Sequence, residues 1–251
     1  MKVSVLSSGS KGNTTYIESD KAKILIDIGN SAKYIKEKLA EFGVEPEELD
    51  AILITHTHVD HVKGLKTFEN KYHVPVYITD IMHRCLSFLE FYTELEEEFD
   101  IKDIHVTSIK TSHDTDDSRG YVLTCNDTSI VYITDTGYIN NKYFDILRNR
   151  DLYIMESNHD IEMLSNSSYP FQLRQRILSD KGHLSNYDSS KYLSSFIGDK
   201  TKYVLLAHLS EENNTEELAY ETLNSRLVND GKHVDNIIIL KQNKETELIC
   251  I

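Results

Sequence analysis

The sequence predicts an α/β protein in which two sheets pack face to face and helices cover the outside, a four-layer αββα sandwich. Short runs of strands open each half of the 251-residue chain, and helices lie between the later strands. No stretch rich in proline or glycine interrupts this order, and the chain has only three prolines. We therefore expect residues 1–251 to form a single domain.

The first half contains five predicted strands and two predicted helices. The N-terminal strands are separated by the Gly/Ser/Asn turn at 8–13, and a helix follows whose apolar stripe is Ile35, Leu39 and Phe42, with Gly43 beyond its end. Asp80 is the predicted cap of a second, amphipathic helix that carries a solvated acidic run at 94–98. The predicted strands are 3–8, 14–18, 23–28, 49–54 and 74–79, and the predicted helices are 32–42 and 81–98.

The second half repeats this order, with strands first and helices later. Three strands precede the first predicted helix of this half, and further strands alternate with helices to the end of the chain. The predicted strands are 104–109, 120–125, 129–134, 152–156, 203–207, 237–241 and 245–250, and the predicted helical stretches are 140–148, 171–178, 186–196 and 215–228.

Composition excludes some classes of protein. With 41 acidic against 27 basic residues the net charge is −14, which argues against a surface that coats nucleic acid. It does not exclude a nuclease, because bound cations reverse the field at the site itself. No run approaches the ~20 apolar residues of a membrane helix, and the N-terminus lacks the pattern of a signal peptide. Three widely spaced cysteines without a CxxC pair argue against disulfides or a thiolate zinc site, so we expect a cytoplasmic protein.

The segment from His56 to His61, His-Thr-His-Val-Asp-His, concentrates four potential metal ligands directly after the apolar run 51–54. In an extended segment, the side chains of His56 and His58 point to the same side and can hold one ion. Asp60 and His61 follow where the backbone turns, so they can reach a second ion. Unliganded burial of three histidines would be costly, which favours a metal-binding role.

Three further candidate ligands lie at or just past the ends of predicted strands, in the order His113, Asp135 and His208. Polar groups at such ends commonly form the sites of sheet proteins. Five histidines and two aspartates suit two divalent ions such as zinc, manganese or iron, and the two carboxylate oxygens of Asp135 could bridge them.

These residues resemble the signature of the metallo-β-lactamase superfamily, in which HxHxDH is followed by distant His, Asp and His ligands. The resemblance covers essentially the whole chain and implies the αββα fold of that superfamily. It also implies how the ligands are divided between the ions. His56, His58 and His113 would hold one metal, Asp60, His61 and His208 the other, and Asp135 would bridge them.

A narrower resemblance is to the YycJ/WalJ family, and four segments carry it. They are Ser7-Ser8-Gly9-Ser10-Lys11-Gly12-Asn13, Glu156-Ser157-Asn158-His159-Asp160, Gly182-His183-Leu184-Ser185-Asn186 and His208-Leu209-Ser210-Glu211-Glu212-Asn213-Asn214. The resemblance implies a bacterial nuclease with 5′–3′ exonuclease action on DNA, and through it a role in DNA repair. The β-CASP domain of RNA-processing relatives is not expected, because the chain is too short to contain it.

Two positions match a catalytic dyad of the superfamily's transfer-RNA-processing branch. There, a Glu after a strand and a His in a Gly-His-Ser/Thr run assist the leaving oxygen, and Glu156 and His183 lie in the corresponding places. A carboxylate beside an imidazole favours the protonated ring that a general acid needs.

Other residues are assigned less directly. Asp27 is expected to brace the histidine segment through a hydrogen bond. Arg174, Arg176 and Lys181 form the basic cluster nearest to His183 and are candidates for phosphate contacts, although solvated helix positions explain them nearly as well. His159, three residues past Glu156, is a candidate to contact the site or the substrate.

We therefore predict a metal-dependent phosphodiester hydrolase, with DNA as the substrate that the resemblance implies. One alternative is a hydrolase of small phosphodiesters or thioesters, which would use the same metals. The alternative from another class is a non-catalytic metal-binding or DNA-binding protein. It is disfavoured because the sequence contains no helix-turn-helix or zinc-ribbon pattern, and because this set of ligands is suited to activating water.

Overall fold

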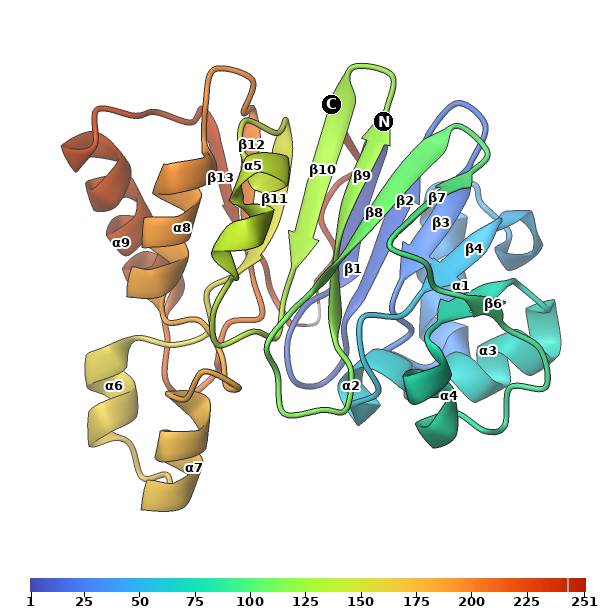
Figure 1. The fold of residues 1–251 in the computed structure, drawn as a ribbon, viewed down its shortest axis with the longest axis horizontal. Coiled ribbons are helices and arrows are strands. Elements are labelled where there is room, and N and C mark those ends of the chain that lie inside the picture. The colour runs from blue at the N-terminus through green and yellow to red at the C-terminus, as the bar shows by residue number, and fades with distance from the viewer. Residues whose placement is uncertain (243) are drawn as a thin grey trace.

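Two seven-stranded sheets pack face to face in the computed structural model, which describes residues 1–242 and 244–251 (Figure 1). In order across the first sheet, the strands are β14 (Ile249–Cys250), β1 (Lys2–Ser7), β2 (Thr14–Glu18), β3 (Lys23–Ile26), β4 (Ala51–Leu53), β5 (Val76–Ile78) and β6 (Thr93–Glu94). In the second sheet they are β13 (Asn236–Ile239), β12 (Tyr203–Ala207), β11 (Leu152–Glu156), β10 (Thr128–Ile133), β9 (Arg119–Cys125), β8 (Ile104–Lys110) and β7 (Glu98–Ile101).

Helices cover the outer face of each sheet, as Figure 1 shows. The helices that lie between the strands of the first sheet in chain order are α1 (Ala32–Glu41), η1 (Pro46–Glu48), α2 (Val59–Val62), α3 (Leu65–Tyr72) and α4 (Asp80–Cys85). Against the second sheet lie η2 (Asn141–Tyr143), α5 (Phe144–Leu147), α8 (Asn186–Phe196) and α9 (Glu216–Asn229). The short helices α6 (Ile161–Asn166) and α7 (Phe171–Ile177) project from one end of the second sheet as an arm (Figure 1).

Successive side chains along a strand point to opposite faces of the sheet, and this divides the core into layers. In β10, Ile130 and Tyr132 point between the two sheets, whereas Val131 and Ile133 pack under the helices of the second sheet. Because both faces of each sheet are covered, the central strands are apolar at nearly every position. The prediction of a four-layer αββα sandwich is confirmed.

Most predicted elements are found within two or three residues of their predicted ends, but the helix predicted at 81–98 is wrong. The helix α4 ends at Cys85, and its N-cap is Thr79, which accepts a hydrogen bond from the Met82 amide, in place of Asp80. Leu86 and Leu89 pack under the helices, whereas Leu95 packs between the sheets. One helix could not bury its single stripe in both layers, so the chain forms β6 and β7 instead.

Three helices escaped the sequence analysis, namely α2, α3 and α6. The predicted strand 245–250 is also shorter, with β14 covering only Ile249–Cys250. Over the described part of the chain, no helix has the length and apolar character needed to cross a membrane.

Candidate metal centre

Three site residues adopt left-handed backbone conformations at strand ends. Asp27 after β3 has φ 63°, Asp135 after β10 has φ 54°, and His208 after β12 has φ 55°. Such a conformation costs about 1–2 kcal/mol for a residue with a Cβ atom. In each case it turns the chain sharply at the end of the strand, and all three side chains lie buried at the same edge of the two sheets.

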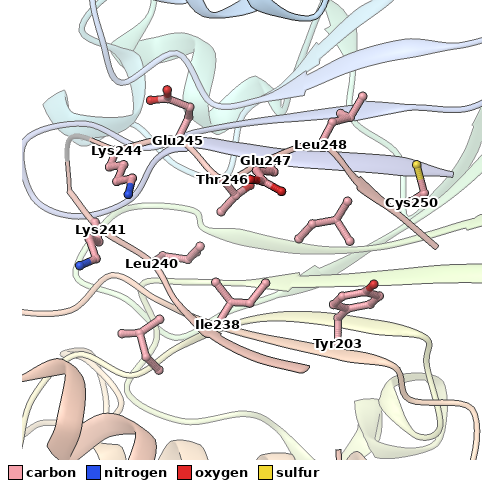
Figure 2. Close-up of a pocket in the computed structure, with 12 residues that line it drawn as sticks. Tyr203, Ile238, Leu240, Lys241, Lys244, Glu245, Thr246, Glu247, Leu248 and Cys250 are labelled. Atoms are coloured by element: carbon pink, nitrogen blue, oxygen red, sulfur yellow. The ribbon is translucent and has the colours of Figure 1, made fainter. Parts of the chain in front are cut away.

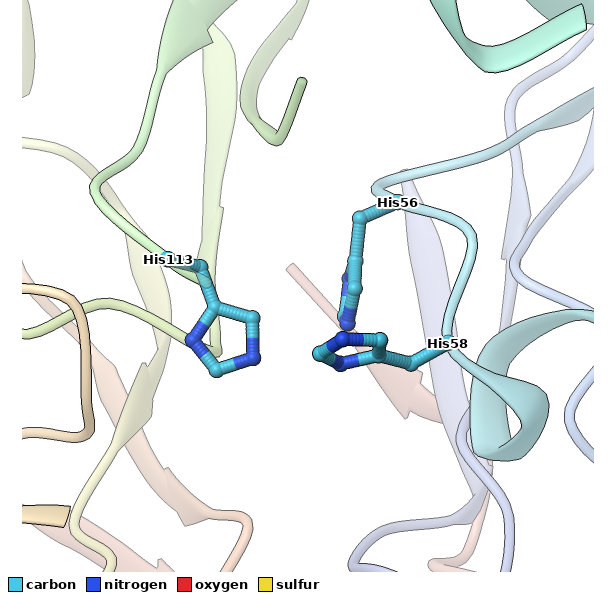
Figure 3. A group of neighbouring side chains, drawn as sticks. All are labelled: His56, His58 and His113. Carbon is cyan, nitrogen blue, oxygen red and sulfur yellow. The ribbon is translucent and has the colours of Figure 1, made fainter. Parts of the chain in front are cut away.

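His56, His58 and His113 form the first cluster of potential ligands. Figure 3 shows their three rings facing one another, and one nitrogen from each ring lies within 4.8 Å of the others. His56 and His58 come from the loop after β4, and His113 from the loop after β8, so the cluster joins the two sheets. His113 Nδ1 lies 3.1 Å from the Gly182 carbonyl oxygen, which leaves Nε2 free to bind an ion.

Asp60, His61 and His208 form the second cluster, and again their ligand atoms lie within 4.8 Å of one another. Asp135 lies between the two clusters, since its Oδ1 is also 3.9 Å from Nε2 of His113 in the first cluster. Its Oδ2 is 3.2 Å from His61 Nε2, and its Oδ1 is 3.5 Å from His208 Nε2. One carboxylate oxygen thus faces each of these two histidines.

The donors that converge here fit divalent cations. The Nε2 atoms of His56 and His208 are buried and have no hydrogen-bond partner among the described residues. A buried nitrogen without a partner is costly unless a ligand occupies it. Imidazole nitrogens with carboxylate oxygens suit zinc, manganese and iron. The structure thus brings together all seven residues that the sequence predicted as ligands.

The mixture of acids and histidines shifts the pKa values of the site residues. Burial disfavours a charge on His61, but Asp27 and Asp135 outweigh it and raise the pKa of His61 well above its ordinary value. Burial likewise opposes charge on His208, yet Asp135 and Asp60 raise its pKa to about 10. For Asp135, burial is outweighed by His208 and His61, which hold its pKa well below the usual range. The carboxylates are therefore ionised, as metal ligands must be.

Asp27 lies behind the histidine loop and makes the contact expected of it. Its Oδ2 is 2.7 Å from His61 Nδ1, and Oδ1 and Oδ2 accept hydrogen bonds from the amide and hydroxyl of Thr55 at 2.8 Å each. All these groups are completely buried or nearly so. With Nδ1 committed to Asp27, His61 presents Nε2 to the site.

Glu156 and His183 lie together beside the clusters. His183 Nδ1 is 2.7 Å from Glu156 Oε1, and the same oxygen is 3.3 Å from His208 Nδ1. Glu156 Oε2 accepts hydrogen bonds from the Thr136 and Leu184 amides at 3.0 and 3.2 Å. Burial opposes charge on His183, but Glu156 outweighs it and raises the pKa of His183.

A cavity of about 210 Å³ lies beside these groups, between the metal centre and the α6–α7 arm. His113, His183 and His208 line its inner side, and Arg176 and Lys181 line it from the arm and the loop that follows. Arg174, by contrast, does not line it; its guanidinium donates to the Ser165 carbonyl within the arm. His159 does not line it either, and the residue is only 1% exposed.

Sequence reasoning did not single out Asp114, although it directly follows His113. Its Oδ1 is 3.4 Å from His113 Nε2 and 3.6 Å from His58 Nε2, and its Oδ2 accepts a hydrogen bond from the guanidinium of Arg176. Asp114 thus connects the first cluster to the arm.

Asn13 was expected to serve the N-terminal turn, and it also reaches the site. Its Oδ1 accepts from the Gly9 amide at 2.7 Å, while its Nδ2 lies 3.2 Å from Asp60 Oδ2 and 3.0 Å from His61 Nε2. The turn at 8–13 is thereby fixed against the second cluster.

Three asparagines from the motifs form a buried network behind the site. Asn186 Nδ2 donates to Asn214 Oδ1 at 2.8 Å, and Asn214 Nδ2 donates to the Ser157 and Asn158 carbonyls at 2.9 and 3.1 Å. Asn158 in turn donates to the His208 carbonyl at 2.9 Å. The three asparagines lie in separate sequence motifs, and only the fold brings them into contact.

A second, larger cavity of about 660 Å³ lies away from the metal centre (Figure 2). Tyr203, Ile238 and Leu240 line one side, and the C-terminal segment with Thr246 and Leu248 lines the other. It opens where the edge strands β13 and β14 face each other, and contains none of the predicted site residues.

Comparison with known proteins gives a consistent result. A family model described as the metallo-beta-lactamase superfamily matches residues 8–208. The chain is 40% identical over 236 residues to exodeoxyribonuclease WalJ of Streptococcus pneumoniae, covering 90% of this chain and 88% of that protein. It is 36% identical over 236 residues to exodeoxyribonuclease YycJ of Bacillus anthracis, covering 91% and 89%.

Among solved structures, the metallo-beta-lactamase fold protein YhfI of Bacillus subtilis superposes with a TM-score of 0.75 at 17% identity, over 98% of this chain and 99% of that one. At this identity the likeness concerns the fold alone.

Proposed function

The chain belongs to the metallo-beta-lactamase superfamily and, within it, to the WalJ/YycJ family, and from this we propose that it is a metal-dependent 5′–3′ exonuclease that hydrolyses DNA. The observation that carries the proposal is the Glu156–His183 pair beside the metal centre, whose histidine lines the same cavity as Arg176 and Lys181. An acid for the leaving oxygen, cations for the phosphates and ligands for metal ions are thereby combined in one place.

Two divalent ions, zinc, manganese or iron, fit the ligands that converge at the sheet edge. The residues that would hold them are His56, His58 and His113 for one, Asp60, His61 and His208 for the other, and Asp135 between them. When bound, such ions lower the pKa of water and offset the negative charge that grows on a phosphodiester during attack.

The protein's own groups supply the remaining steps. Glu156 accepts the Nδ1 proton of His183, so the other ring nitrogen, Nε2, is available to give a proton to the departing oxygen. The Thr136 and Leu184 amides hold the second oxygen of Glu156 and keep the carboxylate in place. Arg176 and Lys181 would bind phosphate oxygens where the DNA enters.

We also infer that residues 1–251 work as one domain, since the ligands come from both sheets. Arg174 and His159 do not line the cavity and would not contact the substrate directly. Arg174 would stiffen the arm through its hydrogen bond to the Ser165 carbonyl, and the buried His159 would support the loop that follows Glu156 at the end of β11.

A nuclease assay tests the proposal. Single-stranded and duplex DNA and RNA, each labelled at one end and prepared with or without a 5′ phosphate, are incubated with protein that has been chelated and then given Mn²⁺ or Zn²⁺. We expect stepwise release of nucleotides from the 5′ end of DNA, dependent on added metal. His56→Ala should abolish it, whereas His233→Ala, at an exposed histidine, should behave as wild type.

Three outcomes would contradict the proposal. Equal cleavage of RNA and DNA would remove the substrate assignment. Turnover of a cyclic nucleotide or thioester without cleavage of DNA would favour the small-molecule hydrolase. DNA binding without turnover under every metal condition would favour the non-catalytic alternative.

A further inference from the structure

A pocket of about 270 Å³ lies on the other side of the loop that carries His113. Its walls come from the end of β8 and from the segment that leads into α5, which lie at the same edge of the second sheet (Figure 1). The lining residues are Lys110, Thr111, Ser112, Tyr138, Asn140, Lys142 and Tyr143.

This pocket is joined to the metal centre by the backbone. Ser112 lines it, whereas the next two residues, His113 and Asp114, line the cavity beside the metal ligands. The two walls are tied together, since the Gly137 amide donates to the Ser112 carbonyl at 2.9 Å and the Ser112 amide donates to Thr136 Oγ1 at 3.0 Å. Consecutive residues of one loop therefore line this pocket and the cavity beside the metal ligands.

Its charge is opposite to that of the molecule as a whole. The chain carries a net charge of −14, yet the lining contains two lysines and no carboxylate. Both lysines are exposed, and across residues 1–242 and 244–251 neither ammonium lies within ion-pairing distance of an acidic side chain. The pocket thus offers two uncompensated positive charges close to the site.

Aromatic rings accompany these charges. Tyr138 is 41% exposed, and the Lys142 ammonium lies 4.7 Å from the ring centre of Tyr143. The Tyr143 hydroxyl accepts a hydrogen bond from the Lys110 amide at 3.1 Å, which fixes this ring in the wall. Surfaces that bind single-stranded nucleic acid usually combine positive charges, which bind phosphates, with aromatic rings, on which bases stack.

We propose that this pocket binds a nucleotide of single-stranded DNA that extends beyond the cleaved nucleotide, with Lys110 and Lys142 on its phosphates and Tyr138 against its base. The inference rests on the proposed nuclease function and adds to it a second binding position. It makes single-stranded DNA of several nucleotides a better substrate than a dinucleotide, which ends within the cavity.

The test compares cleavage of a twelve-residue oligothymidylate with cleavage of a thymidine dinucleotide by the full-length, metal-loaded protein. For Lys110→Ala/Lys142→Ala we expect the ratio of the two kcat/KM values to fall at least fivefold. In a plot of log kcat/KM for the oligomer against the logarithm of the salt concentration, the slope should become less steep by about 1.4, because two contacts to single-strand phosphates are lost. Lys33→Ala/Lys191→Ala, which removes two exposed lysines elsewhere, should match wild type.

Tyr138 provides the second arm of the experiment. Tyr138→Ala should lower the same ratio several-fold, and Tyr138→Phe should restore it, since stacking needs the ring and not the hydroxyl. If the lysine double variant cleaves DNA normally and its kcat/KM ratio and salt slope are unchanged, the proposed binding of DNA in this pocket is wrong, whereas the proposed nuclease function stands.

A wild-type protein that cleaves no DNA would overturn the proposed function instead. Fluorescence anisotropy with a labelled twelve-residue oligothymidylate then decides about the pocket. Binding that the lysine double variant weakens at least fivefold supports it, and equal or absent binding overturns it.

Discussion

The Oδ2 atom of Asp27 lies 2.7 Å from Nδ1 of His61, and neither side chain is exposed to solvent. Asp27 directly follows β3, whereas His61 lies in the short helix α2 that follows β4, so the ends of two neighbouring strands fix one imidazole. The orientation of His61 is thereby set before any ion arrives.

Replacing Asp27 should weaken metal binding. In the wild type, Asp27 Oδ2 accepts hydrogen bonds from His61 Nδ1 and Thr55 Oγ1. In Asp27→Asn, an amide NH₂ that cannot accept takes the place of this oxygen. Loss of such a partner typically lowers metal affinity about 10- to 100-fold. Competition with a chromogenic chelator measures it, and Asp20→Asn, at an exposed position, serves as the control. Equal affinities in the two variants would show that Asp27 does not position His61.

Removing His183 should slow cleavage in a way that depends on the leaving group. With DNA, whose leaving oxygen needs a proton, His183→Ala should lower kcat by about 10²- to 10⁴-fold. With bis(p-nitrophenyl) phosphate, whose leaving group departs as a stable anion, the loss should be much smaller. Steady-state kinetics on both substrates, with His233→Ala as control, give the comparison. Equal losses on the two substrates would contradict a role as general acid.

Asp151 should make stability depend on pH in the acid range. It is buried, and this opposes its charge, but hydrogen bonds from the Ser129 hydroxyl and amide at 2.8 and 2.9 Å, together with Lys200 at 3.2 Å, lower its pKa. A carboxyl whose pKa is lower in the folded state stabilises the protein above its unfolded pKa of about 4, and this contribution is lost as pH falls toward the folded value.

Urea unfolding of wild type and Asp151→Asn should therefore differ by about 1–3 kcal/mol in unfolding free energy at neutral pH. The difference should shrink below pH ~4. Asp145→Asn, whose side chain is 93% exposed, is the matched control and should change little. A difference that stays constant down to low pH would contradict the assignment.

The asparagine network should contribute to stability through its buried donors. Asn214→Leu removes the donor for the Ser157 and Asn158 carbonyls and leaves both buried oxygens without it. We expect the free energy of unfolding to fall by about 2–3 kcal/mol. Urea unfolding compares this variant with Asn229→Leu, at an exposed position of α9. Identical unfolding midpoints for the two variants would show that the network is not needed for stability.

Local signals account for the elements that the sequence predicted well. The helix α8 begins after Ser185, whose hydroxyl accepts from the Asp188 amide at 3.1 Å, and both of its ends match the predicted 186–196. The histidine loop is equally local, because its ligands are adjacent in the chain. Such features depend on nearest neighbours and can be inferred without the fold.

Other features depend on contacts between distant segments. The predicted helix 81–98 failed because Leu95 is buried between the sheets, a layer that its neighbours in sequence do not reach. The approach of Asp114 to Arg176, and of Asn13 to Asp60, joins segments 62 and 47 residues apart. No periodicity or motif spacing encodes these pairs.

Division of the ligands between the two sheets has a consequence for folding. His61 precedes every strand of the second sheet, whereas His208 follows β12, and the Nε2 atoms of both lie near Asp60 and Asp135. An ion held by both would act as a cross-link that closes most of the chain into a loop, and would reduce the conformational entropy of the unfolded state wherever the ion stayed bound. Loss of the ions would remove this cross-link and leave the apolar core between the sheets as the main connection between the two halves, so the catalytic centre would also contribute to stability.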